Sequence, residues 1–242
     1  MSIRIGIIGA SGNMGKRLVA LGSSDPDFTI IGGTCSKNSP HLSQDLALLA
    51  GVSPIGIPCT ASIEDLASAD VLIDFSHYTF FPTVINCAKQ YNIPVVIGTT
   101  GLGSSEHALM QEASKTIPIF HAPNFSVGMA LLIKAIRHVS ANIPQEFSIS
   151  IEETHHTHKK DAPSGTALAI AATLHREVPI TYKREGQVIG DHIVHFQSPL
   201  ETIAFSHSAL SRDLFAKGAL LAAKFILRQP AGLFGMTHLI SI

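Results

Sequence analysis

The stretch Ile3-Arg-Ile-Gly-Ile-Ile-Gly-Ala-Ser-Gly-Asn-Met-Gly15 decides the fold class of the first half of this chain. Its first seven residues form a short apolar run that ends in glycine, which is typical of a buried strand. The next segment, Lys16–Leu21, has the composition of a helix. A glycine-rich turn between a strand and a helix is the arrangement that dinucleotide-binding βαβ units use. This start therefore predicts a nucleotide-binding domain.

The spacing of the small residues in this turn has a physical explanation. When the motif is read one residue after Gly9, Ala10 takes the place of the first glycine, where the tight turn needs a small residue. Gly12 stands where the backbone approaches the pyrophosphate, and Gly15 where the helix packs on the strand. The phosphates then lie against free N–H groups at the positive end of the helix. The predicted cofactor loop comprises Gly9, Ala10, Ser11, Gly12, Asn13, Met14 and Gly15, and a tight turn without a ligand is the alternative.

Further apolar runs alternate with segments of helix length up to about residue 120. Continuous apolar strands that alternate with helices indicate a parallel sheet covered on both faces. The first half is therefore predicted to be α/β, with a Rossmann-like, doubly wound parallel sheet. The predicted strands are Phe28–Ile31, Val71–Phe75, Val95–Ile97 and Ile117–Phe120, and the predicted helices are Pro82–Tyr91 and Ser105–Lys115.

The pattern changes after Asn124. Strand Phe147–Ile151 alternates apolar and polar residues, which suits a sheet with one covered face. The second half is therefore predicted to be a smaller α+β domain. Its other predicted elements are helices at Val127–Val139, Ser164–Leu174 and Ser211–Leu227 and strands at Ile189–Phe196 and Thr202–His207.

Composition excludes several classes of protein. The 242 residues are 45% apolar and only 14% charged, which excludes a disordered chain. The formal net charge is −1 and the 17 Lys and Arg residues are scattered, which argues against a nucleic-acid or membrane-surface binder. We see no signal peptide and no apolar run of the roughly 18 residues that a membrane helix needs. No CxxC spacing occurs among the three cysteines, Cys35, Cys59 and Cys87. We therefore expect neither a disulfide framework nor a zinc site, and a cytoplasmic location fits best.

The position that selects between NADH and NADPH lacks a carboxylate. The dinucleotide fingerprint expects Asp or Glu about 20 residues after the glycines, on the ribose hydroxyls. That position falls in Thr34-Cys-Ser-Lys37. Ser36 can hydrogen-bond a 2′-phosphate and Lys37 can neutralise it, so NADPH is predicted to be preferred, with NADH possible. A solvated loop lysine is the alternative.

Two more turns follow predicted strands at the same sheet edge. Ligands of open α/β sheets bind outside the carboxyl ends of the strands. Gly98-Thr-Thr-Gly101 offers hydroxyl and backbone donors there, and Ala122-Pro-Asn-Phe-Ser126 offers the amide of Asn124. An amide pairs well with a carboxamide such as that of nicotinamide. Plain strand-ending turns are the alternative.

The stretch Glu152-Glu-Thr-His-His-Thr-His-Lys-Lys-Asp-Ala-Pro-Ser-Gly-Thr166 carries the chemistry of the second half. Three imidazoles and two ammonium groups crowd His155–Lys160, and like charges depress one another's pKa. Such a group suits general acid catalysis near neutral pH. The N–H groups of Gly165 and Thr166 open the next predicted helix, and Lys159 supplies a matching charge, so the pattern predicts a carboxylate pocket beside a proton donor. A metal site is disfavoured by the two lysines and the absence of HExxH, and an exposed basic loop is the remaining alternative.

These motifs occur together in one family. The chain resembles the bacterial 4-hydroxy-tetrahydrodipicolinate reductases, long called dihydrodipicolinate reductases, which act in the diaminopimelate branch of lysine biosynthesis. The resemblance covers essentially the whole chain, and the histidine stretch with Asp-Ala-Pro-Ser-Gly-Thr is its most specific part. The matching segments are Gly9–Gly15, Ile73–Ser76, Gly98–Gly101, Ala122–Gly128, Glu153–Ala167, Lys183–Gly186, Ser211–Arg212 and Gly232–Phe234.

The resemblance implies an oxidoreductase that uses NADPH or NADH to reduce a cyclic, imine-type dicarboxylate after loss of water. It implies His155 as the general acid and Lys159 as a second donor that also contacts the substrate. The other implied substrate-binding residues are His156, Gly165, Thr166 and Thr100. The implied contacts to the nicotinamide end are Gly98, Thr99, Thr100, Gly101, Ala122, Pro123, Asn124 and Phe125.

The resemblance also implies the organisation of the chain. The family has a Rossmann-like domain and a smaller substrate domain whose sheet mediates a homotetramer, and its last long helix returns to the first domain. The implied bounds are 1–125 with 212–242 for the cofactor domain, and 126–211 for the substrate and oligomerisation domain.

The chain departs from the family pattern in three places. Ser36 and Lys37 stand where many members carry an acidic and then a basic residue, which favours NADPH. His77-Tyr-Thr follows Ile-Asp-Phe-Ser, where other residues are frequent. Only Gln187, Val188 and Ile189 separate Gly186 from Gly190, so we expect a trimmed substrate-domain sheet.

Two other functions compete with a reductase. One is a regulator that binds NADPH without turnover, in which the basic cluster is a partner-binding loop. The other is a dehydrogenase of aldehydes that forms a thiohemiacetal, which needs a reactive cysteine. All three cysteines lie within the predicted dinucleotide domain and outside the motifs, which disfavours the aldehyde dehydrogenase.

Overall fold

The computed structural model describes residues 2–174 and 176–240, which form two compact units. The first unit comprises Met1–Phe125 and Phe215–Ile242, and the second comprises Ser126–Leu214. The chain thus returns to the first unit at Phe215, in the first turns of the last long helix, whereas the resemblance implies a return at residue 212. No helix among the residues described has both the length and the apolar character that crossing a membrane requires.

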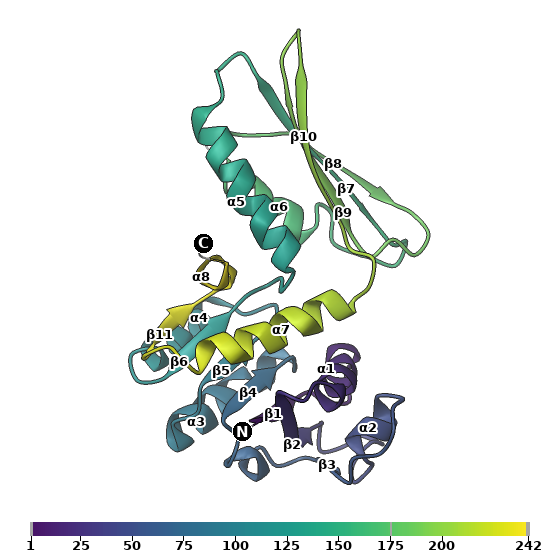
Figure 1. Cartoon of the computed structure of the whole chain (residues 1–242), viewed down its shortest axis with the longest axis vertical. Coiled ribbons are helices and arrows are strands. Elements are labelled where there is room, and N and C mark those ends of the chain that lie inside the picture. Colours follow the sequence, from purple (N-terminus) through teal and green to yellow (C-terminus); the bar gives the residue numbers. More distant parts are fainter. Residues whose placement is uncertain (1, 175, 241–242) are drawn as a thin grey trace. The chain divides into compact units, whose positions relative to one another are not determined.

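A seven-stranded parallel sheet forms the centre of the first unit (Figure 1). The chain runs outward from β1 through β2 to β3, and then outward in the other direction from β4, which pairs with β1. This confirms the predicted doubly wound sheet and places its switch point between β1 and β4. The spatial order is β11 (Gly232–Phe234), β6 (Pro118–His121), β5 (Val95–Ile97), β4 (Val71–Asp74), β1 (Ile3–Ile8), β2 (Phe28–Thr34) and β3 (Cys59–Thr60).

Helices cover both faces of this sheet, because alternate strand residues are apolar on both sides. Ile8 packs in the core beneath α3 and α4, whereas Ile5 lies under Gly22 of α1 on the opposite face. On that second face Phe225 of α7 meets Phe120 edge-on, with ring centroids 6.0 Å apart. The helices of this unit are α1 (Asn13–Ser24), α2 (Leu46–Leu49), α3 (Phe81–Tyr91), α4 (Ser104–Ala113), α7 (Asp213–Ile226) and α8 (Met236–Leu239).

A mixed four-stranded sheet forms the second unit, as the predicted α+β domain requires. Strand β7 pairs antiparallel with β9 and parallel with β8, and β9 pairs antiparallel with β10. Two helices cover one face of this sheet (Figure 1). The spatial order is β10 (Thr202–Ser208), β9 (Asp191–Gln197), β7 (Ser148–His155) and β8 (Ile180–Arg184), and the helices are α5 (Val127–Asn142) and α6 (Gly165–Ala171).

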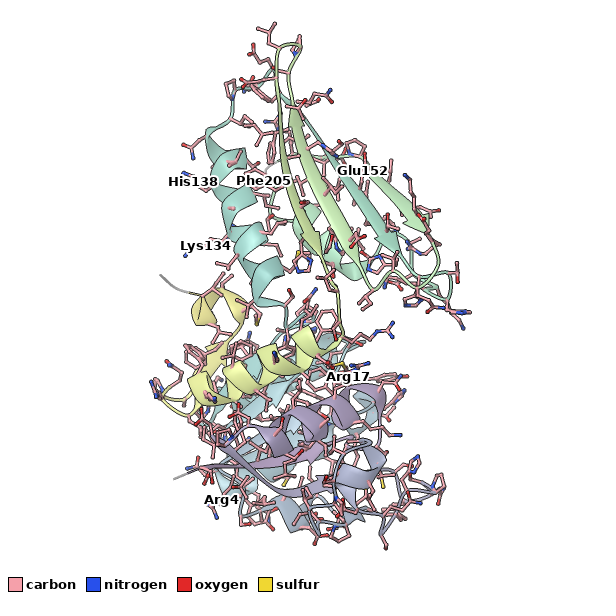
Figure 2. All side chains as sticks on the ribbon, turned by 45° about the vertical axis from the view of Figure 1, so that its right-hand side comes forward. Arg4, Arg17, Lys134, His138, Glu152 and Phe205 are labelled. Atoms are coloured by element: carbon pink, nitrogen blue, oxygen red, sulfur yellow. The ribbon has the colours of Figure 1, made fainter. Side chains whose placement is uncertain are left out.

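Side chains of the second unit separate cleanly into a covered and an uncovered layer. Phe205 packs with the core between the sheet and its helices, whereas Glu152 belongs to the other face of the sheet (Figure 2). Lys134 and His138 project from the side of α5 that is turned away from the sheet (Figure 2). One covered face explains why Phe147–Ile151 alternates apolar and polar residues.

Two features of this sheet differ from the sequence-based expectation. Strand β7 continues to His155, so its predicted end at Ile151 is wrong. Strand β8 was not predicted, because it is an edge strand with polar, exposed residues at its centre and therefore has no apolar signal. The short segment after Gly186 lies in the β8–β9 connection, and the sheet still has four strands.

Candidate active site

The glycine loop connects β1 to α1 and has the geometry of a phosphate site. Gly9 has a φ of +78°, which a residue with a side chain rarely adopts. A methyl group on Gly15 would collide with the Gly9 carbonyl and lie 2.6 Å from the Cα of Ala10, so the helix packs directly on the loop backbone. Gly12 is the N-cap and offers no capping side chain. The first N–H groups of α1 therefore have no intrahelical partner and suit an anion.

Strand order brings the other predicted cofactor segments to the same edge. β4, β5 and β6 follow β1 side by side, and all are parallel, so the segments after them share its carboxyl edge. These segments include Gly98–Gly101 and Ala122–Phe125. The rings of Phe75 and Phe125 meet there, with centroids 5.4 Å apart. Ser36 and Lys37 follow β2, on the other side of β1, and both are exposed.

Thr99 is placed differently from its neighbour Thr100. Its hydroxyl is buried and donates a hydrogen bond to Oδ2 of Asp74, at 2.8 Å. Oδ1 of Asp74 accepts from the N–H of Ser76 at 2.9 Å. Burial raises the pKa of the Asp74 carboxyl. Thr99 therefore connects two loops at this edge, while the exposed Thr100 faces solvent. Sequence reasoning did not single out Asp74. The signal that could have found it is a carboxylate at the end of a buried strand.

The charge of Lys37 has a carboxylate near it. Glu64 accepts a short hydrogen bond from the Ser62 hydroxyl, which is the main reason that its pKa is lowered, and the charge of Lys37 adds to this shift. The lysine is thus a cation at the loop after β2, and its charge makes only a small contribution to the shift at Glu64. It keeps the exposure that a contact to a phosphate requires.

The second unit places His155 at the end of a strand with an unusual buried face. Along β7 the inward residues are Ile149, Ile151, Glu153 and His155, and all four are buried. Glu153 and His155 are two residues apart and therefore share one face of the strand. A glutamate that continues an apolar alternation is the signal by which sequence reasoning could have found Glu153.

Glu153 is the centre of a hydrogen-bonded cluster. One oxygen, Oε2, pairs with Nδ1 of His155. The other, Oε1, accepts from the N–H of Ser164 at 3.0 Å and from the guanidinium of Arg184 at 3.1 Å. His192 of β9 packs edge-on against His155, with ring centroids 5.1 Å apart, and its Nε2 lies 3.3 Å from the Ser164 hydroxyl. Arg184 and His192 come from strands that flank β7 on either side.

These contacts set the charges of the cluster. Burial acts to raise the pKa of Glu153, but hydrogen bonds from Arg184, Ser164 and His155 outweigh it, so the pKa is lowered and the carboxylate is ionised. Burial lowers the pKa of His155; Glu153 opposes this shift, whereas Lys159 and Arg184 add to it. The predicted direction is therefore correct, but burial and not crowding of like charges is the main cause. Burial and the charge of His155 lower the pKa of His192 to about 4, so His192 is neutral.

Lys159 and Gly165 both face a carboxylate, and it is that of Asp161. The Lys159 Nζ lies 2.9 Å from Oδ2 of Asp161. Hydrogen bonds from Lys159 and from the N–H groups of Asp161 and Gly165 lower the pKa of this carboxyl. Thr166 follows in the first turn of α6 and is half-buried. The predicted carboxylate-binding groups are thus arranged around a carboxylate of the chain itself.

The remaining histidines of the motif differ in environment. His156 is half-buried, and its pKa is lowered by burial and by the charge of Arg212. His158 is exposed, with its ring 6.3 Å from that of His156. The stretch is therefore not one cluster of equivalent imidazoles, because only His155 belongs to the strand and to the buried network.

Metal binding has one candidate grouping among the residues described. Glu153, His155 and His192 each offer a ligand atom, and these atoms lie within 4.8 Å of one another. Arg184 already pairs with Glu153 in the same place, and its positive charge opposes a second cation there. The arrangement favours a proton-transfer site over a metal centre.

The cysteines do not form a nucleophilic site. Cys59 and Cys87 are buried, and Cys35 is half-buried. Burial and the neighbouring Cys35 thiol raise the pKa of Cys59 to about 12, and burial raises that of Cys87. A thiol with a raised pKa is a poor nucleophile, which opposes the aldehyde dehydrogenase hypothesis.

Family models match both halves of the chain. Residues 3–125 match the model of the dihydrodipicolinate reductase N-terminus, and residues 128–240 match that of its C-terminus. The chain belongs to the dihydrodipicolinate reductase family. The predicted family and the prediction of an oxidoreductase are confirmed.

Relatives resemble the chain over its full length. It is 37% identical to 4-hydroxy-tetrahydrodipicolinate reductases of Caldanaerobacter subterraneus and Rubrobacter xylanophilus, with 99% of this chain and 99% and 98% of the relatives aligned. The first alignment spans 263 positions, more than this chain has residues, so that relative carries segments that this chain lacks. A dipicolinate-bound dihydrodipicolinate reductase of a Paenisporosarcina species has the same fold, with a TM-score of 0.82, 22% identity, and 97% and 98% of the two chains covered.

Proposed function

We propose that this chain reduces 4-hydroxy-tetrahydrodipicolinate to tetrahydrodipicolinate, with hydride from NADPH and a proton from His155. The observation that carries the proposal is the buried pair of Glu153 and His155 at the end of β7, close to the cationic Lys159. The relatives named above support the substrate, and the solved relative holds a dicarboxylate. The overall change releases water and consumes one NADPH and one proton.

The cofactor residues that we propose lie along the carboxyl edge of the first unit. Two features suit a pyrophosphate bound against the loop. Any side chain at Gly15 would collide with the loop backbone, and α1 begins without a capping side chain. A bound nicotinamide supplies the hydride. The proposed contacts are Gly9, Ala10, Ser11, Gly12, Asn13, Met14 and Gly15 for the phosphates, Ser36 and Lys37 for the 2′-phosphate, and Gly98–Gly101 with Ala122–Phe125 for the nicotinamide end.

The substrate residues that we propose belong to the second unit. Lys159 pairs with one carboxylate of the substrate and orients it, and the N–H groups of Gly165 and Thr166 donate to that carboxylate. His156 adds a further donor. His155 holds the proton that the substrate ring accepts, and the burial of His155 keeps bulk water away from that proton. A contact from Thr100, a homotetramer and a cytoplasmic location stay predictions.

The test follows NADPH absorbance with substrate made in situ from pyruvate and aspartate semialdehyde by the preceding synthase. Rapid oxidation that needs every component is expected. Omission of the synthase, of either precursor or of this protein is expected to abolish it. Binding of NADPH without any oxidation would favour the regulator hypothesis instead.

The cofactor preference is tested by Lys37→Gln. Native protein is expected to have the higher kcat/KM with NADPH, and the variant to lose about two- to fivefold of it, because an exposed ion pair contributes up to about 1 kcal/mol. Its kcat/KM with NADH is expected to stay unchanged. The exposed Lys89, on α3, gives the control Lys89→Gln. A native preference for NADH, or equal losses with both cofactors, would contradict the role of Lys37.

The contact between Lys159 and Asp161 predicts competition with the substrate. Asp161→Asn removes the carboxylate that faces Lys159, so the KM for the dicarboxylate is expected to fall by up to about fivefold, with kcat unchanged. Initial rates at varied substrate concentration measure this. The exposed Glu185 provides the control Glu185→Gln. A higher KM in Asp161→Asn would show that Asp161 orients Lys159 and does not compete.

A further inference from the structure

Packing alone does not explain why the carboxylate of Glu153 is buried. It occupies an inward position of β7 between an apolar strand segment and His155, and it is 2% exposed. A buried carboxylate is costly unless it is paired and hydrogen-bonded. Here both oxygens are occupied, Oε2 by His155 and Oε1 by Ser164 and Arg184. The chain thus devotes a backbone N–H and a guanidinium to keeping one carboxylate against one imidazole.

We propose that Glu153 is a positioning residue, which holds His155 with a proton on Nδ1 so that Nε2 is the atom that delivers the proton to the substrate. The proposal rests on the proposed function, because it assigns a partner to its proton donor. An ionised carboxylate only accepts hydrogen bonds, so Nδ1 must be the donor in the pair. Nε2 is on the far side of the ring, where it faces Gly190, whose lack of a side chain leaves it room.

The same contact decides when Nε2 carries a proton. A neutral imidazole has one N–H, and Glu153 holds it at Nδ1, so Nε2 is protonated only in the imidazolium. The charged and titratable groups that face His155 are Glu153 on its own strand, Arg184 on β8, His192 on β9 and Lys159 in the following loop. Lys159 and Arg184 oppose the imidazolium, and His192 is neutral. Glu153 is therefore the one of these four groups that favours it.

Arg184 and Ser164 act on Glu153 and not on His155. Both bind Oε1, which fixes the carboxylate plane and directs Oε2 to Nδ1. Arg184 stands opposite His155 in the parallel register of β7 and β8, so the strand pairing itself places the guanidinium. This support explains how the carboxylate stays ionised in a buried position.

The experiment compares pH profiles of kcat/KM for the native protein and for Glu153→Gln. A general acid acts only when it is protonated, so the rate falls as pH rises through the pKa of His155. Glu153→Gln removes the charge that favours the imidazolium, so this falling limb is expected to move to lower pH by about 1 to 2 units. At a pH above both limbs, kcat/KM is then expected to be lower by about 10- to 100-fold.

Two further variants separate positioning from folding. Glu153→Asp keeps the charge, and its falling limb is expected to lie between those of the native protein and of Glu153→Gln. Glu152→Gln is the matched control, because Glu152 is exposed on the other face of the same strand, and its profile is expected to be unchanged. A Glu153→Gln protein with native circular dichroism and NADPH affinity but an unmoved limb would overturn the proposal.

A measurement without turnover gives a second readout. Nitrogen-15 spectra of histidine-labelled native protein, assigned with His155→Gln, are expected to show the Nδ1–H tautomer of His155 at neutral pH. An Nε2–H tautomer would overturn the proposal even if Glu153→Gln does not fold. If His155→Ala kept native turnover, the proposed proton donor would fail first. If His155→Ala lost turnover and Glu153→Gln kept the native profile, only the role of Glu153 would fail.

Discussion

His155→Ala is expected to lower kcat by about 10²- to 10⁴-fold, the usual contribution of a general acid. The variant removes the proposed proton donor and leaves Glu153 without the imidazole that pairs with Oε2. The affinity for NADPH is expected to stay unchanged, because the proposed cofactor residues all belong to the other compact unit. Single-turnover NADPH oxidation and a separate fluorescence titration measure the two effects.

The exposed His158 supplies the matched control for this variant. His158→Ala removes an imidazole from the same motif but not from the buried cluster, so near-native kcat is expected. Lys159→Ala is expected to raise the KM for the dicarboxylate as well as to lower kcat, since we propose that the lysine orients the substrate and supplies a positive charge to it. Near-native turnover of His155→Ala, or an equal loss in His158→Ala, would contradict the assignment of the donor.

Gly15→Ala is expected to raise the Kd for NADPH by about 10- to 100-fold and to lower the free energy of unfolding by about 1–3 kcal/mol. The added methyl group would collide with the Gly9 carbonyl and lie 2.6 Å from the Cα of Ala10. Both are backbone atoms, so relief requires that α1 move away from the loop that is proposed to hold the phosphates. Fluorescence titration and urea unfolding, followed by circular dichroism, measure the two quantities.

Gly22→Ala in the same helix is the control for this effect. Its methyl group would lie 3.2 Å from Cδ1 of Ile5, the flexible end of a side chain, and it would also raise helix propensity. Native affinity for NADPH and unchanged or slightly higher stability are therefore expected. If Gly15→Ala and Gly22→Ala had the same affinity for NADPH, the loop would not be the phosphate site.

The cofactor half of the protein was predictable because its signals are local. Buried parallel strands are short continuous apolar runs, and the turn after β1 must contain small residues at fixed positions. The predicted runs at Ile3–Gly9 and Val95–Ile97 correspond closely to β1 and β5. The behaviour of Thr99 was not predictable, since its hydroxyl is bound by Asp74 from a different strand.

In the second half, two strands were predicted poorly: the exposed edge strand β8, and β7, whose buried face is partly polar. β8 is polar at its centre and carries no apolar signal, yet it brings Arg184 opposite His155. β7 continues beyond Ile151, but Glu153 and His155 occupy the inward positions there, which apolar residues normally fill. A pattern that counts only apolar residues ends the strand too early at such a place.

The sequence by itself determined the fold class, the position of the glycine loop, the family and the motif that contains the proposed proton donor. Each of these depends on residues that are near one another in the chain. Only the tertiary structure decided which groups act on His155, namely Glu153 from its own strand and Arg184 and His192 from the flanking strands. It also decided that Asp161 faces Lys159. The physical reason is that burial and strand pairing, and not distance along the chain, set which charges interact and how strongly.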